Sequence, residues 1–225
     1  KSHIALAGPA NKQGRIAADH ICGRRSAYTG ALGTSVLKLF DLTAASTGLN
    51  EKQARAAGVA YDKVVTYSAS HASYYPGARN MTVKTLFDPA SGRILGAQIV
   101  GFDGVDKRMD VLAAAIRAGL TAEQLTELDL AYAPPYGSAK DPVNMAGYVI
   151  ENVRAGLVEQ HHWDAVAELS ADGSVILLDV RTPGEVRKQG LLRSDALHIP
   201  LDELRGRLGE LDKGKKIYVN CYSGL

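Results

Sequence analysis

The chain is built around a hairpin with the sequence Thr82-Val-Lys-Thr-Leu-Phe-Asp88-Pro-Ala-Ser-Gly92-Arg-Ile-Leu-Gly-Ala-Gln-Ile-Val100. Its two apolar runs, 82–88 and 93–100, read as strands, and the insert Pro89-Ala-Ser-Gly92 between them has the composition of a turn. A third run, 63–68, precedes them. Three successive strands of this kind predict an antiparallel meander.

Helices are predicted beside these strands from caps and apolar periodicity. Asn50 with Gln53 is a helix cap, and Thr121 with Gln124 is a second one. A longer helix follows from one apolar stripe, and another begins at the cap-and-proline pair Asp141-Pro142 and runs to about residue 154. The stripe of the longer helix consists of Met109, Leu112, Ala113, Ile116 and Leu120. The packing face of the helix that begins at Asp141-Pro142 consists of Val143, Ala146, Gly147, Ile150 and Val153. Sheet and helices together predict an α+β unit.

The residues before the meander predict three further elements. Residues 35–40 form an apolar strand, and residues 42–48, Leu-Thr-Ala-Ala-Ser-Thr-Gly, have the composition of a short helix ended by glycine. Residues 6–21 predict a helix with Pro9 near its start, where the missing N–H costs nothing.

The composition of the sequence changes after Gly156, and we place a domain boundary near residues 156–163. The continuous apolar run Val175-Ile-Leu-Leu-Asp-Val180 predicts a strand buried on both faces, as in a parallel sheet. A helix at 201–211 and a strand at 217–220 continue an α/β alternation, which stops after two strands.

Composition narrows the class of protein. The 225 residues carry a formal net charge of +2 and are 46% hydrophobic, with scattered basic residues, which argues against nucleic-acid or membrane partners. No apolar run reaches membrane-spanning length, and no signal peptide opens the chain. The two cysteines, Cys22 and Cys221, lie far apart, which favours a cytoplasmic location. His161 and His162 read as solvated linker residues, so no metal site is predicted.

Cys221 follows the last apolar strand and opens a glycine-containing loop. Backbone N–H groups in such a loop can stabilise a thiolate, which is the form that attacks sulfur. The alternative is a buried strand-end cysteine that only packs. Cys22, flanked by Ile21 and Gly23 at a helix end, is interpreted as structural.

The second part of the chain resembles the rhodanese sulfurtransferase family in three motifs, Leu178 to Pro183, His198 to Leu204, and Cys221-x-x-Gly224. The resemblance implies that Cys221 is a nucleophile carrying sulfane sulfur and that Gly224 permits the loop geometry. It also implies that Asp179 and Arg181 brace the neighbouring strand end. The arginine and the small hydroxylated residue that normally continue this loop have no counterpart before the chain ends.

The first part resembles the FAD- and pyridine-nucleotide-dependent disulfide reductases. The stretch 88–101 is similar to the hairpin of their C-terminal dimerisation domain. Residues 71–78, His-Ala-Ser-Tyr-Tyr-Pro-Gly-Ala, and 132–144 look like the subgroup that reduces coenzyme A disulfide or persulfide with NADH. Some members of that subgroup carry a C-terminal rhodanese domain.

This resemblance implies roles for several residues. Tyr74 or Tyr75, together with Tyr132, would reach the flavin and the bound thiol of the partner subunit, although tyrosines also serve as plain interface aromatics. Lys140 reads first as a neighbour of a helix cap and second as a ligand contact. The helix start would lie against the flavin, with FAD, NADH and coenzyme A as the implied cofactors and ligand. That start comprises Leu6, Ala7, Gly8, Pro9, Ala10 and Asn11.

We therefore expect the tail of an FAD-binding domain at 1–30, an α+β dimerisation domain at 31–156 that forms a homodimer, and an incomplete α/β rhodanese-like domain at 164–225. The function implied is a flavin-dependent NADH reductase of coenzyme A disulfide, persulfide or polysulfide. The sequence lacks a Gly-x-Gly-x-x-Gly fingerprint and the redox cysteine of the flavin domain, so this chain alone should be inactive. The alternatives are an independent sulfurtransferase on a dimerising scaffold and a non-catalytic dimerisation fragment.

Overall fold

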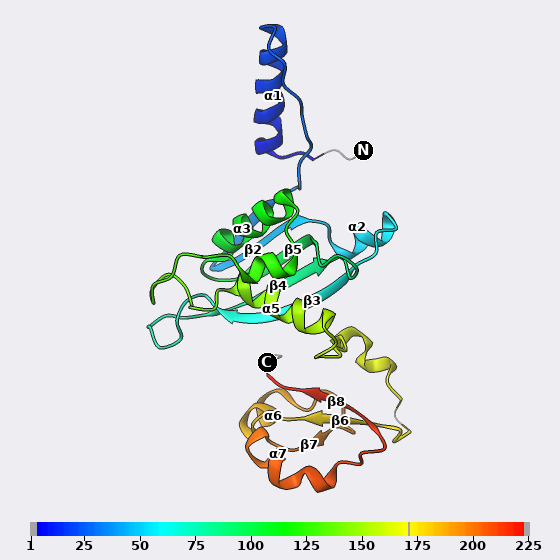
Figure 1. The fold of residues 1–225 in the computed structure, drawn as a ribbon. Helices are drawn as coiled ribbons and strands as arrows, with labels where there is room; N and C mark the ends of the chain where they lie inside the picture. Colours follow the sequence, from blue (N-terminus) through cyan, green and yellow to red (C-terminus); the bar gives the residue numbers. More distant parts are fainter. Residues whose placement is uncertain (1–3, 171, 223–225) are drawn as a thin grey trace. The chain divides into compact units, whose positions relative to one another are not determined.

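The computed structural model describes residues 4–170 and 172–222. The chain forms two compact units, Lys1–Leu157 and Val158–Leu225 (Figure 1). The division falls inside the interval 156–163, where the composition of the sequence changes. Each unit has its own sheet and its own apolar cluster.

The first unit contains a five-stranded antiparallel sheet with the order β1-β2-β5-β4-β3. The predicted meander is confirmed, because β4 pairs with both β3 and β5 and Thr82 lies opposite Val100. The strands are β1 Ser35–Leu39, β2 Leu42–Gly48, β3 Asp62–Ala69, β4 Asn80–Phe87 and β5 Ile94–Gly101.

The turn between β4 and β5 is held by its own side chains. The Asp88 carboxylate accepts hydrogen bonds from the Ala90 backbone N–H at 3.0 Å and the Ser91 hydroxyl at 2.5 Å, and the Ser91 bond is the main reason why the pKa of Asp88 is lowered. Gly92 has φ of 74°, a backbone conformation that favours glycine. The turn predicted at 89–92 is therefore confirmed.

The helix predicted at 42–48 is wrong, because these residues form β2. The chain reverses at Phe40 and Asp41, with Phe40 at φ 51°, so that Leu42 pairs with Leu39. The next residues then pair with both β1 and β5. Pairing on both sides overrides the weak helical composition of small residues. Gly48 does not end a helix but sits against the carbonyl of Leu95 on β5, where a Cβ would overlap it.

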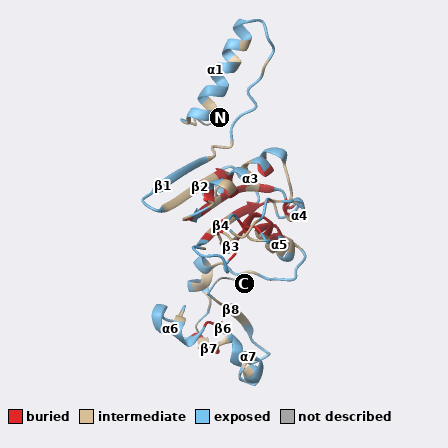
Figure 2. Cartoon of the chain, turned by 90° about the vertical axis from the view of Figure 1, so that its left-hand side faces the viewer, coloured by how far each residue is buried: buried red, intermediate tan, exposed pale blue. Residues whose placement is uncertain are grey.

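Helices pack against the sheet and enclose the main core (Figure 2). The caps at Asn50 and Thr121 are confirmed, each as a full capping box. Fully buried Phe87 and Ile99 of the sheet belong to one cluster with Leu112 of α3, and burying each such side chain contributes about 1.5–3 kcal/mol. The helices are α2 Glu51–Ala56, α3 Val105–Ala118, α4 Ala122–Thr126 and α5 Pro142–Arg154.

Two parts of the first unit remain uncovered in this structure. The helix predicted at 6–21 is confirmed as α1, Ala7–Ile21, and none of its residues is buried (Figure 2). Every residue of β1 is exposed as well, including Val36, Leu37 and Leu39. No helix in the described part of the chain combines the length and apolar composition needed to cross a membrane.

The second unit contains a three-stranded parallel sheet with the order β7-β6-β8. The parallel arrangement is confirmed, but the count of two strands is wrong, because the two-residue β7 before Pro200 is too short to show periodicity. The helix at 183–189 was not predicted, although Thr182 and Glu185 form a capping box at its start. The elements are η1 Trp163–Glu168, β6 Val175–Asp179, α6 Pro183–Gln189, β7 Leu197–His198, α7 Leu201–Arg207, η2 Leu208–Glu210 and β8 Lys216–Asn220.

Candidate functional site

Two loops of the first unit bring a pair of tyrosines together. Loop 70–79 joins β3 to β4, and loop 127–141 joins α4 to α5; we call them the tyrosine loops. The hydroxyls of Tyr74 and Tyr132, one from each loop, lie 2.8 Å apart in a hydrogen bond. Both rings are accessible, with 75% of Tyr74 and 47% of Tyr132 exposed. Two phenols from distant parts of the sequence thus meet at the surface.

Tyr75 does not share this pair. Its ring stands edge-on to His71 at 5.7 Å between centroids, and the His71 ring contacts the Ala72 carbonyl at 3.2 Å. Tyr136, 73% exposed on the second loop, was not singled out, although the Tyr-Ala-Pro-Pro-Tyr run contains it. Of the two tyrosines left open by the sequence, the structure pairs Tyr74 with Tyr132.

The hydrogen bond with Tyr74 raises the pKa of the Tyr132 phenol above its ordinary value. The group therefore remains protonated at neutral pH, where it can donate a hydrogen bond without competing as a nucleophile. A neutral donor pair is suited to stabilising an anion that develops nearby.

A buried ion pair lies at the base of the tyrosine loops. Arg108 of α3 and Asp141, the N-cap of α5, are 1% and 3% exposed. The Arg108 Nη2 atom donates to Asp141 Oδ2 at 2.9 Å and to the Ser70 carbonyl at 3.0 Å, while Nε reaches Oδ2 at 3.1 Å. The Asp141 carboxylate also accepts from the Val143 backbone N–H at 3.0 Å, which confirms the predicted cap.

Lys140 precedes this cap and is exposed. It is the neighbour of the Asp141 helix cap, and its contact with a ligand stays a prediction. No group of three or more metal-ligating side chains occurs among the described residues.

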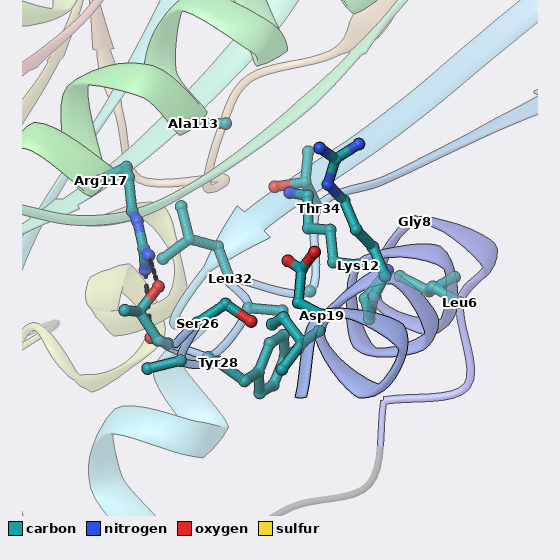
Figure 3. Close-up of a pocket in the computed structure, with 18 residues that line it drawn as sticks. Leu6, Gly8, Lys12, Asp19, Ser26, Tyr28, Leu32, Thr34, Ala113 and Arg117 are labelled. Atoms are coloured by element: carbon teal, nitrogen blue, oxygen red, sulfur yellow. Dashed lines mark hydrogen bonds between the residues drawn. The ribbon is translucent and has the colours of Figure 1, made fainter. Parts of the chain in front are cut away.

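The start of α1 borders a groove of about 600 Å³ (Figure 3). Leu6, Gly8 and Pro9 line it, whereas Ala7, Ala10 and Asn11 do not. Asn11 instead donates to the Ala7 carbonyl at 3.0 Å. The rest of the lining comes from later residues of α1, the segment 26–34 and α3, including Lys12, Arg15, Tyr28 and Arg117.

Cys221 lies directly after β8 and is half-buried. It packs against the cluster of Leu178, Val180 and Ile199. Gly224, the predicted loop glycine, lies outside the described residues. Cys22 is exposed at the C-cap of α1, so the interpretation of this residue as a packing cysteine does not hold in this structure.

Asp179 and Arg181 form a buried fork at the end of β6. Arg181 Nε lies 2.9 Å from Asp179 Oδ1, Nη2 lies 2.6 Å from Oδ2, and Nη2 also donates to the Gly190 carbonyl at 2.7 Å. Burial alone would raise the pKa of Asp179, but hydrogen bonds from Arg181 outweigh it and hold the pKa below its usual value. Asp179 pairs with Asn220 in the sheet register, one residue before Cys221.

Known proteins resemble both the sequence and the fold. Residues 34–142 match the family model described as the dimerisation domain of pyridine nucleotide-disulphide oxidoreductases. A coenzyme A disulfide reductase of Staphylococcus haemolyticus is 40% identical over 148 residues, covering 65% of this chain and 33% of that protein. A relative with the same name from Staphylococcus aureus (strain bovine RF122 / ET3-1) is 39% identical over 146 residues, 64% and 33% of the two chains. The chain thus spans about a third of the length of these relatives.

Two solved structures cover nearly the whole chain. Reduced Bacillus anthracis CoADR-RHD superposes with a TM-score of 0.91 at 50% identity, covering 98% of this chain and 39% of that one. An NAD-dependent persulfide reductase from A. fulgidus gives a TM-score of 0.82 at 42% identity, covering 94% and 37%. The first unit has the antiparallel sheet and packed helices expected of the matched domain. Residues 34–142 are therefore similar, in sequence and in the arrangement of sheet and helices, to a dimerisation domain of the pyridine nucleotide-disulphide oxidoreductases.

Proposed function

We propose that this chain is part of a flavin-dependent reductase that uses NADH to cleave coenzyme A disulfide, persulfide or polysulfide. The observation that carries the proposal is the exposed Tyr74–Tyr132 pair, with 2.8 Å between its hydroxyls. The likeness to a coenzyme A disulfide reductase and to an NAD-dependent persulfide reductase supports it.

The tyrosine pair would act on the departing sulfur. When a sulfur–sulfur bond takes up two electrons, one sulfur leaves as a thiolate or sulfide, and a neutral phenol can donate a hydrogen bond to it. A persulfide, NADH and one proton thereby give a thiol, hydrogen sulfide and NAD⁺. Tyr74 orients Tyr132 by the bond between them, so that one hydroxyl is held in place while the other proton faces the substrate.

The residues at the start of α1 fit one edge of a flavin only. The first turn of α1 contains no acidic residue, and its N-cap Leu6 provides no side-chain hydrogen bond, so backbone N–H groups there remain available to an anion. Leu6, Gly8 and Pro9 would contribute this edge, with NADH bound elsewhere in the full-length protein. A bound flavin supplies two-electron transfer between NADH and a sulfur–sulfur bond.

The finer assignments follow from the same proposal. The protein would be a homodimer through residues 31–156, with the tyrosines of one subunit serving the site of its partner. The second unit, from 164 onward, would be a rhodanese-like sulfur acceptor in which Cys221 carries the persulfide. The buried fork of Asp179 and Arg181 would brace the sheet beside that cysteine.

Kinetics of the full-length protein containing this chain test the reductase. Tyr132→Phe is expected to lower kcat for coenzyme A disulfide or persulfide by roughly 10²-fold, as loss of one anion-stabilising donor does. Tyr148→Phe, which removes a hydroxyl of a part-exposed tyrosine on α5, is the matched control and should retain the rate. Equal rates in Tyr132→Phe and the parent protein would refute the role of the pair.

A second candidate function, independent sulfur transfer, is favoured by the position of Cys221 at a strand end. A protein that moves sulfur from thiosulfate to cyanide without bound flavin would support it. A colourless dimer that neither transfers sulfur nor oxidises NADH would leave only a dimerisation module.

A further inference from the structure

The tyrosine pair is the outermost of three links between the tyrosine loops. The middle link is a hydrogen bond from the Ala72 backbone N–H to the Gly137 carbonyl, 2.8 Å long. The innermost link is the Arg108 guanidinium, whose Nη2 atom donates both to the Ser70 carbonyl and to Asp141. Ser70 begins the first loop and Asp141 ends the second.

Arg108 is itself held in place by its own helix. Its Nη1 atom donates to the Gly104 carbonyl at 3.2 Å, and a Cβ at Gly104 would collide with Nη1. The side chain is 1% exposed, so water does not compete for these bonds. A planar guanidinium presents five N–H donors from three nitrogen atoms in fixed directions, whereas the three donors of a lysine ammonium all radiate from one atom at the end of a flexible stem.

We propose that Arg108 is the positioning residue of the tyrosine pair, because its guanidinium joins the bases of both loops and so sets where Tyr74 and Tyr132 meet. The inference rests on the proposed function for its catalytic consequence alone. Arg108 touches neither hydroxyl of the pair and acts through the backbone of the two loops.

The test follows the titration of Tyr132 in the 225-residue chain. Fluorotyrosine incorporation and ¹⁹F NMR resolve the ten tyrosines, and the Tyr74→Phe and Tyr132→Phe variants assign the two signals of interest. Tyr74→Phe should lower the titration midpoint of Tyr132, because it removes the bond that raises the pKa of Tyr132. In Arg108→Lys, the titration midpoint of Tyr132 is expected to fall in the same way. In the double variant Arg108→Lys with Tyr74→Phe, the midpoint should fall no further than in either single variant.

Two further variants separate positioning from general stability. Arg154→Lys alters another arginine of the first unit, one that pairs with Glu123 and donates to the Ala90 carbonyl at 3.2 Å, and it should leave Tyr132 unchanged. Asp141→Asn keeps an oxygen to cap α5 while removing the charge, and it should lose the shift as Arg108→Lys does. This variant provides the result if Arg108→Lys does not fold.

A lower melting temperature with an unaltered Tyr132 titration in Arg108→Lys and Asp141→Asn would overturn the proposal, because Arg108 would then stabilise the fold without positioning the pair. Loss of the shift supports it. If Arg108→Lys or Asp141→Asn loses the shift of Tyr132 but the same variant of the full-length reductase keeps its kcat, the positioning inference stands and the catalytic role of the tyrosines fails.

Discussion

A single glutamate connects three elements of the first unit. Glu51, in the first turn of α2, accepts hydrogen bonds from Lys63 of β3 at 3.2 Å and from Lys84 of β4, and its side chain is 13% exposed. It also accepts from Arg55 at 3.0 Å one turn later in α2. Burial alone would raise the pKa of Glu51, but the lysines outweigh it and lower the pKa to about 2. The charged form is therefore the one that stabilises the fold.

This predicts a defined loss of stability in acid. The folded-state pKa lies below the ordinary value of 4.5, so the stabilisation is complete above pH 4.5 and is lost as the pH falls toward 2. Urea unfolding should show Glu51→Gln to be less stable than the parent by about 3 kcal/mol at pH 7, with the difference shrinking toward zero near pH 2. Glu127→Gln, at an exposed position, should show no such trend. A constant difference across this range would contradict the assignment.

The second unit offers two forks of similar geometry but different burial. Asp179 and Arg181 are 0% and 8% exposed, whereas the side chains of Asp195 and Arg193 are 45% and 21% exposed. Asp179→Asn leaves a buried guanidinium without its charge partner and should cost about 3–5 kcal/mol. Asp195→Asn should cost no more than about 1 kcal/mol. Chemical denaturation followed through the lone tryptophan, which lies in this unit, measures both, and equal costs would show that burial does not govern the pair.

At the level of elements, caps and long apolar patterns predicted most of the fold. The capping boxes at Asn50 and Thr121 mark α2 and α4 because each satisfies backbone groups within four residues. By contrast, β2 is decided by strands that lie elsewhere in the sequence. The choice between Tyr74 and Tyr75 depends likewise on the path of a loop held by distant Arg108, which local patterns do not contain.

The β2–β5 pair contains a close approach that the sequence shows only as glycines. Gly96 pairs with Gly48, and a Cβ at Gly96 would overlap the Leu49 carbonyl. Gly96→Ala should therefore destabilise the first unit by about 2 kcal/mol or more, because the backbone of the two strands must shift to make room for the added methyl group. In α1 a Cβ at Gly14 would meet nothing within 4 Å, so Gly14→Ala should be neutral or stabilising. Thermal unfolding of both variants measures the contrast, and similar melting temperatures would contradict it.

Among residues 4–170 and 172–222, the structure has two apolar clusters, one in each unit. The larger is enclosed by sheet and helices, while the smaller has Leu178, Val180 and Ile199 as its buried members. Stability is therefore expected to be unequal along the chain, with local unfolding confined to one unit at a time.

Hydrogen exchange can test this independence. Ile199→Ala should speed amide exchange in β6, β7 and β8 and leave β3, β4 and β5 as they were, because Ile199 belongs to the second cluster alone. Leu112→Ala, in the first cluster, should do the reverse. Faster exchange in both sheets from either substitution would show that the units unfold together.

The uncovered β1 has a practical consequence for handling the polypeptide. An open edge strand with Val36, Leu37 and Leu39 exposed is a template for stacking copies edge to edge, and a charged side chain on the strand is a common guard against fibre growth. In β1 this charge is Lys38, which lies between Leu37 and Leu39. Its ammonium group is what we expect to keep concentrated solutions clear, so replacing Lys38 with valine should turn them cloudy while the folded sheet itself remains intact.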